Sequence, residues 1–209
     1  MKIRILFSLM VAAAVGCVPS AAPLKGVPAP DRTLPSLSLP VGHRHLVFKW
    51  EYQEGEIAAR GDGSVRTAAP DSARLDFFLG GGLGAGAAVL IGDSLRSPHA
   101  ELARRYIPPS PMMWAVLGRL AIPPLPDTVV RIDGDLLRAD VGSPVQWRVG
   151  IRGDTLVELQ HISGGKIIES ITRGANGVLT YEAPGARRRL ELTFLRDQPG
   201  SFDASIWGL

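Results

Sequence analysis

The segment RHLVFKWEY, residues 44–52, alternates between two kinds of side chain along its whole length. Leu46, Phe48, Trp50 and Tyr52 occupy every second position, and most residues between them are polar or charged. Successive side chains of a strand point to opposite faces, so this period of two is typical of an antiparallel strand with one buried face. We therefore predict a strand here, in a sheet with large aromatic residues on one side.

Further runs with the same period follow along the chain. They are Ala73-Leu75-Phe77, Trp147-Val149-Ile151 and Leu190-Leu192-Phe194. Turn signals rich in glycine and aspartate, such as Gly61-Asp62-Gly63 and Asp133-Gly134, lie between such runs. Short strands at this spacing predict a mainly β fold, in which an antiparallel sheet curls into an incomplete barrel.

The middle of the chain has a different pattern. Residues 99–106 fit a short helix, and residues 112–122 fit a second one that Pro111 can open. The second segment is apolar nearly all round, with Arg119 as its only charge, so it must be buried on most sides. We predict a helical insertion at about residues 99–122 that covers the sheet as a lid.

The amino terminus has the pattern of an export signal. Lys2 and Arg4 precede an apolar stretch of a length typical of signal peptides, about 7–15 residues, and too short for a spanning helix. The sequence Ala14-Val15-Gly16-Cys17 resembles the lipobox of bacterial lipoproteins. The resemblance implies cleavage before Cys17 and attachment of diacylglycerol to its thiol, which would anchor the protein in a membrane. An ordinary signal peptide that ends in a cysteine is the alternative.

Composition divides the rest of the chain in two. Residues 18–42 contain Pro19, Pro23, Pro28, Pro30, Pro35 and Pro40, and such a stretch tends to be extended. We therefore expect a signal peptide at 1–16, the lipidated Cys17 and a linker at 17–42, and one domain at 43–209. Val18 stands where an aspartate favours retention in the inner membrane of Gram-negative bacteria. Its presence favours the outer membrane, with the domain facing the periplasm.

Charge and histidine spacing argue against two classes of partner. The net charge of +3 falls to +1 when Lys2 and Arg4 leave with the signal peptide, so we predict no binding to nucleic acid. His43 and His45 share one face of a strand, but a zinc site needs three or four ligands. We predict neither a metal site nor a cofactor. The oligomeric state stays open.

The order of strands, a helical insertion and further strands resembles the lipoprotein-localisation superfamily of LolA- and LolB-like proteins. Residues 47–52 are similar to the first long strand of that family, residues 63–66 and 70–75 to a strand pair, and residues 146–149 to a late strand. The resemblance implies a half-barrel around a cavity that binds an acyl chain or another lipoprotein. It implies these ligand-binding residues: Leu46, Phe48, Trp50, Leu75, Phe77, Met113, Trp114, Leu117, Trp147 and Val149.

Two other functions remain open. The same apolar residues could fill a solid core, which would leave a structural or interaction lipoprotein of the cell envelope. Gly92-Asp93-Ser94-Leu95 is similar to the first block of the GDSL esterases, in which the serine is a nucleophile. Such a serine needs a histidine and an orienting carboxylate, and the order of residues here departs from that family's later blocks. We therefore predict no enzyme activity and no catalytic residue.

Overall fold

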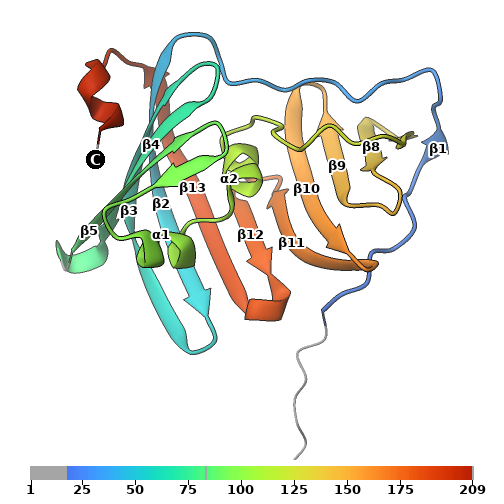
Figure 1. The fold of residues 1–209 in the computed structure, drawn as a ribbon. Helices are drawn as coiled ribbons and strands as arrows, with labels where there is room; N and C mark the ends of the chain where they lie inside the picture. Colours follow the sequence, from blue (N-terminus) through green and yellow to red (C-terminus); the bar gives the residue numbers. More distant parts are fainter. Residues whose placement is uncertain (1–17, 83, 209) are drawn as a thin grey trace, which may run out of the picture.

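The computed structural model describes residues 18–82 and 84–208. Its strands form one antiparallel sheet of 13 strands, in the order β1-β7-β8-β9-β10-β11-β12-β13-β2-β3-β4-β5-β6. The sheet curls around a concave face without closing, so β1 and β6 are its edges (Figure 1). Pairing of β13 with β2 joins the first half of the chain to the second.

The elements follow the chain in simple order. The strands are β1 (Val27–Pro28), β2 (His43–Glu54), β3 (Ile57–Ala68), β4 (Ser72–Leu79), β5 (Ala85–Ile91), β6 (Ser94–Arg96), β7 (Thr128–Asp133), β8 (Leu136–Val141), β9 (Trp147–Arg152), β10 (Thr155–Ser163), β11 (Lys166–Arg173), β12 (Leu179–Ala183) and β13 (Arg188–Pro199). The helices are α1 (Ala100–Tyr106) and α2 (Ser110–Val116), with the 3₁₀ turns η1 (Gly80–Gly82), η2 (Pro184–Ala186) and η3 (Ala204–Trp207).

The mainly β fold predicted from the alternating runs is confirmed. β2 contains the whole segment 44–52, and Phe48, Trp50 and Tyr52 are buried while Lys49 and Glu51 are exposed. Gly63 on β3 makes room for this aromatic face, because a Cβ there would lie 2.3 Å from the ring of Phe48. The other three runs lie in β4, β9 and β13.

Both predicted helices are present, but α2 is shorter than the sequence suggested. It ends at Val116, and Gly118 follows with a positive φ of 86°. The Arg119 N–H donates to the Trp114 carbonyl, and the Gly118 N–H donates to the Ala115 carbonyl. This is the Schellman ending that a glycine allows. Among the described residues, no helix is long and apolar enough to cross a membrane.

The core lies on the concave face of the sheet. α2 packs there against β10 and β11, and Met112, Met113, Trp114, Ala115 and Val116 are all buried. The Trp114 indole N–H donates to the Gly92 carbonyl at 2.7 Å, so the one polar group of this side chain is satisfied. α2 therefore fills the space in front of the second half of the sheet.

The proline-rich segment that we expected as a linker packs along the domain. β1 within it pairs with β7, and Leu37 and Leu39 are buried in the main core. The Leu37 carbonyl also accepts a hydrogen bond from the Leu120 N–H, just after α2. The composition of the chain changes at residue 43, but the residues before it pack into the same core as the residues after it.

Candidate ligand-binding site

A cavity of about 260 Å³ lies between α1 and the concave side of the first half of the sheet. Its walls come from β2, β4, β5, β13, α1 and the segment that precedes α1. The lining residues are mainly apolar: Trp50, Tyr52, Phe77, Leu79, Ala85, Gly86, Ala87, Ser97, His99, Ala103, Tyr106, Ile107 and Leu190. An apolar cavity with few polar groups is the usual form of a small-ligand site.

Small residues on β5 create the space. Ala85, Gly86 and Ala87 follow one another at the wall of the cavity. A Cβ built on Gly86 would meet no atom within 4 Å beyond its chain neighbours. The volume therefore comes from missing side chains rather than from separated strands.

Aromatic rings form the wall beside these small residues, because Phe77 of β4 is the cross-strand partner of Gly86. Phe77 packs edge-on against Trp50, with ring centroids 5.8 Å apart, and against Phe48 at 5.5 Å. The Trp50 indole N–H donates to the Asp62 carbonyl at 3.0 Å, which leaves its apolar surface for the cavity. Edge-to-face contacts of this kind hold rings in fixed positions. This wall is therefore preformed and apolar.

One carboxylate connects α1 to the sheet. Glu54, at the end of β2, binds Arg105 of α1 at 2.5 Å and Arg188 of β13 at 3.2 Å. Tyr52 adds a hydrogen bond from its hydroxyl to the Arg105 carbonyl, and its ring lies 4.7 Å from that of Tyr106. Hydrogen bonds from Arg105 and then Arg188 lower the pKa of Glu54. The same carboxylate thus stays ionised and holds α1 over the cavity.

The start of α1 has fewer contacts than its end. His99 precedes the helix, and its side chain makes no capping hydrogen bond, although such a cap commonly stabilises a helix. The two hydrogen bonds of Ser97 lie outside the helix, one to the Ala87 carbonyl and one from the His99 N–H. α1 is therefore fixed chiefly through its last turn.

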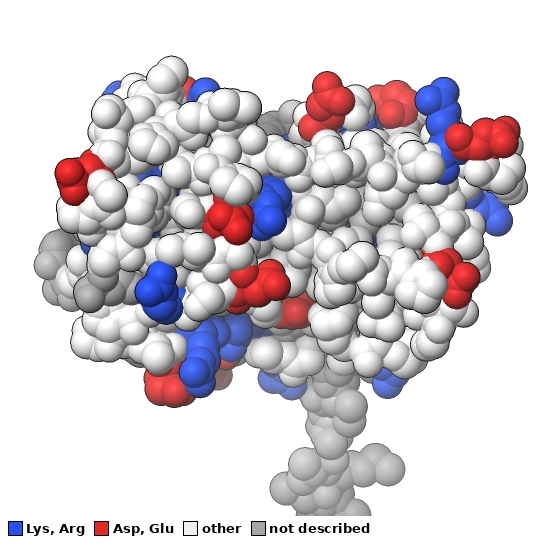
Figure 2. Space-filling model, turned by 45° about the horizontal axis from the view of Figure 1, so that its top comes forward, with Lys and Arg blue, Asp and Glu red and all other residues white. Residues whose placement is uncertain are grey.

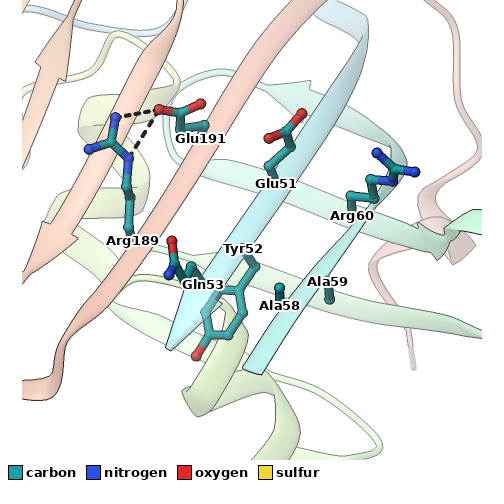
Figure 3. A pocket seen from close by; sticks show the side chains of 8 residues that line it. All are labelled: Glu51, Tyr52, Gln53, Ala58, Ala59, Arg60, Arg189 and Glu191. Carbon is teal, nitrogen blue, oxygen red and sulfur yellow. Dashed lines mark hydrogen bonds and ion pairs between the residues drawn. The ribbon is translucent and has the colours of Figure 1, made fainter. Parts of the chain in front are cut away.

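A second hollow lies on the convex face, across β13, β2 and β3. It has a volume of about 520 Å³ and is lined by Glu51, Tyr52, Gln53, Ala58, Ala59, Arg60, Arg189 and Glu191 (Figure 3). Arg189 is already paired, because it binds both Glu191 and Glu182. This hollow is larger than the cavity under α1, but charged side chains line much of it. The cavity under α1 is the better site for an apolar ligand.

Two of the ten residues expected to bind ligand line the cavity, Trp50 and Phe77. Phe48 and Leu75 are fully buried beside them, and Leu46 is half-buried against the same core. Of these three, Phe48 contacts the ring of Phe77. The first half of the sheet thus contributes five of the ten residues to the core, and two of them line the cavity.

The other five lie in the second half of the core, outside the cavity. Met113 and Trp114 are buried in α2, and Leu117 is half-buried at its end. Trp147 and Val149 are buried on β9. These five residues therefore belong to the buried core on the side of α2 and β9, and they do not line the cavity under α1.

Trp147 belongs to a small polar cluster on the concave face. Its ring stacks on His161 at 4.4 Å, and His161 Nδ1 lies 3.3 Å from Glu169. The Tyr181 hydroxyl donates to the same carboxylate at 2.7 Å. Burial, followed by the hydrogen bond to Glu169, raises the pKa of Tyr181. The contacts of this cluster connect β9 to β12, and its polar groups bind one another.

Ser94 lies in a β-hairpin and not at the start of a helix. It begins β6 and pairs with Ile91 of β5, and Gly92 forms the turn with a φ of 54°. Among the described residues, no hydrogen bond joins Ser94 to a histidine. Nor do those residues contain a group of three or more His, Cys, Asp and Glu that could hold a metal ion.

Charges of both signs are mixed on the face seen in Figure 2, and large uncharged areas lie between them. Over the part of the chain that the structure describes, several cations are paired across strands, for example Arg66 with Asp76 at 2.9 Å and Arg138 with Glu158 at 2.8 Å. Such pairs neutralise one another locally. The charges on this face form no continuous basic stripe.

Comparison with solved structures identifies the class of fold. A LolA superfamily protein from Nitrosomonas europaea superposes with a TM-score of 0.56, covering 83% of this chain and 93% of its own, at 8% sequence identity. A domain described as an outer membrane lipoprotein-sorting protein from Vibrio parahaemolyticus gives a TM-score of 0.44 at 6% identity, covering 79% of this chain and 89% of its own.

A DUF1329 family protein from Desulfovibrio piger gives a TM-score of 0.43 at 9% identity, covering 80% of this chain and 90% of its own. No protein-family model and no curated protein matches the sequence. The superposition on the LolA superfamily protein, with its TM-score of 0.56, shows that the chain has a LolA-like fold, a curled sheet with helices on its concave side.

Several residues of the site were missed in the sequence. Tyr52 belongs to the alternating segment of β2 and could have been added on that pattern. The run Ala85-Gly86-Ala87 carried a signal too, since consecutive small residues leave space beside large ones. The pairing of Glu54 with Arg105 had no local signal, because the two residues are far apart in the chain.

Proposed function

We propose that this protein is a lipid-anchored component of the bacterial cell envelope that binds an acyl chain in the cavity under α1. The chain could belong to a free lipid or to the lipid part of another lipoprotein. The observation that carries the proposal is the apolar cavity of about 260 Å³ beneath a short helix. The LolA-like fold supports it as an analogy of architecture.

The volume limits the ligand to one short stretch of hydrocarbon. An apolar cavity of about 150 Å³ can hold a benzene ring, so the volume of about 260 Å³ has room for roughly ten carbon atoms. Each methylene transferred from water gains about 0.8 kcal/mol. A single chain of this length is therefore a suitable ligand without further opening of the domain.

A displacement titration tests the cavity. Decanoate should displace a fluorescent apolar probe such as N-phenyl-1-naphthylamine from the purified protein. Gly86→Leu should lower the affinity by about tenfold or more, because a leucine side chain fills space that several methylenes would occupy. Equal binding by Gly86→Leu and the wild type would rule out this cavity.

Ala58→Leu is the matched control. Ala58 is exposed in the charged hollow on the convex face, so the same side chain is added on the other side of the sheet. Decanoate affinity should stay within about twofold of the wild type, because surface substitutions of this kind change little. Organic extraction of the wild-type protein should also release bound lipid. A protein that is free of lipid and does not bind decanoate would favour the structural lipoprotein instead.

The anchor is a separate part of the proposal, and it rests on the lipobox-like sequence that ends in Cys17. We propose that the mature protein begins at Cys17, carries acyl chains there and lies in the outer membrane facing the periplasm. More than one chain is needed for stable anchoring. Mass spectrometry of the amino-terminal peptide should find the modified cysteine, and Cys17→Ser should release the protein from membranes. An unmodified Cys17 in the wild type would refute the anchor.

A further inference from the structure

The described chain begins against one end of the domain. The Cγ2 atom of Val18 lies 3.8 Å from the position of a Cβ built on Gly185 in η2. Pairing continues at the next residues, because Ser20 forms an isolated β-bridge with Lys166 at the start of β11. The chain therefore lies between two turns of the domain, beside the lower ends of β11 and β12 (Figure 1).

Backbone hydrogen bonds fix this start. The Ile167 N–H donates to the Pro19 carbonyl at 2.9 Å, and the Ala21 N–H donates to the Gly165 carbonyl at 2.8 Å. Further along, the Arg148 guanidinium donates to the Ala22 carbonyl at 2.7 Å. The segment is thus bound to the domain from its second described residue onward.

Because the chain is attached to the domain from Pro19 onward, the tether between a lipid on Cys17 and the domain is very short. Cys17 is the residue before Val18, so their Cα atoms lie about 3.8 Å apart across a trans peptide, and Cys17 to Ser20 spans at most about 11 Å. The headgroup layer on each side of a bilayer is about 5–8 Å thick. A free linker of 25 residues would instead reach about 25–30 Å on average. A lipid on Cys17 therefore brings the neighbouring turns to the bilayer surface.

We infer that this end of the domain docks on the membrane in a fixed orientation. The inference rests on the proposed lipidation of Cys17. We call the surface the anchor end and define it as residues 163–166 and 184–188. These residues include no acidic residue, Lys166 is exposed among them, and Arg188 is ion-paired with Glu54. The short tether makes a lipid bilayer the occupant of this surface, and the charge of Lys166 favours a bilayer with anionic headgroups.

The orientation places the cover of the cavity beside the membrane. Arg188 belongs to the anchor end and binds Glu54, which also binds Arg105 of α1. Figure 1 shows α1 at the same end of the sheet as η2 and the start of the described chain. An acyl chain could then pass between bilayer and cavity over a short path instead of through bulk water.

Fluorescence quenching of the lipid-modified protein in vesicles tests the orientation. The vesicles contain anionic lipid and a nitroxide attached to lipid headgroups. A fluorophore is placed on Ser163→Cys at the anchor end, or on Ser201→Cys beyond β13. β13 has 12 residues, so the two positions are separated by about 35–40 Å along the sheet. Quenching at position 163 should be at least about threefold stronger. Equal quenching, or stronger quenching at 201, would overturn the inference.

A tether variant provides the control. Insertion of twenty Gly and Ser residues between Val18 and Pro19 keeps every bond from Pro19 onward but lengthens the reach by about 25 Å. Quenching at 163 should fall towards the value at 201, and unchanged quenching would overturn the role of the short tether. Failure of lipidation is distinguished beforehand, because an unmodified protein does not float with vesicles. Failure of acyl binding would leave the quenching difference unchanged.

Discussion

α1 and α2 are both seven residues long and both cover the concave face, but they pack in opposite ways. α2 carries no charge and buries five consecutive residues, 112–116. α1 carries Glu101, Arg104 and Arg105, and a single carboxylate on the sheet holds its last turn. α2 therefore completes the core, whereas α1 covers the cavity. Four predictions test this difference, from the largest expected effect to the smallest.

Trp114→Ala should give the largest loss of stability. The indole is fully buried and hydrogen-bonded to Gly92, and removal of such a side chain leaves a cavity that costs about 3–5 kcal/mol. Equilibrium urea unfolding followed by far-UV circular dichroism measures the change. A loss below about 1 kcal/mol would mean that α2 does not complete the core.

Leu37→Ala tests whether the proline-rich segment supports α2. Leu37 is 9% exposed and accepts a backbone hydrogen bond from Leu120. Truncation of a buried leucine should lower the free energy of unfolding by about 2–3 kcal/mol. Pro35→Ala is a nearby control with little expected effect. If the two variants were equally stable, the segment would be a linker after all.

Tyr106→Ala should cost much less, because it acts on α1. It removes a ring contact with Tyr52, and such a contact contributes about 1 kcal/mol. The loss opens the cavity, so decanoate should dissociate faster in stopped-flow measurements while the domain stays folded. A destabilisation as large as that of Trp114→Ala would remove the distinction between the helices.

Glu54 should make ligand exchange depend weakly on pH. Its pKa is lowered from the ordinary value of 4.5 by Arg105 and Arg188. A carboxylate of this kind stabilises the closed state above its unfolded pKa, and the effect disappears as pH falls through the lower folded value. Exchange should therefore become about two- to fivefold faster below pH 4.5, as expected for exposed ion pairs.

Glu54→Gln provides the comparison for this pH effect. The variant should exchange ligand faster at neutral pH and should lose the acid-dependent increase of the wild type. Arg105, Arg188 and the Tyr52 hydroxyl are the groups that face Glu54. None of them titrates near pH 4. An unchanged pH profile in Glu54→Gln would assign the effect to another carboxylate.

The sheet and both helices could be predicted from local patterns. The alternation of residues 44–52 indicated β2, and Gly118 would have placed the end of α2 correctly if its capping role had been considered. The site of the cavity could not be predicted in the same way. Met113 and Trp114 are as apolar as Trp50 and Phe77, and only the packed structure separates residues that fill space from residues that surround it.

The proline-rich segment shows a second limit of the sequence. Prolines indicated an extended chain, and β1 is extended. Whether an extended chain lies free or packs along a sheet depends on distant partners such as β7 and Leu120, which no local pattern specifies. Leu37 and Leu39 were the one sign in this segment that it packs on the domain, because a solvated linker seldom contains large apolar residues.

The seam between β13 and β2 determines when this domain can be completed. Arg44 binds Asp197 across a separation of 153 positions in the chain, and pairing of such distant segments is slow. During synthesis the amino-terminal half is made first, and β2 must then wait with one edge unpaired until β13 has been made. Chains that stall before β13 expose this edge to each other and to proteases, so the late arrival of a single strand controls the yield of the whole domain.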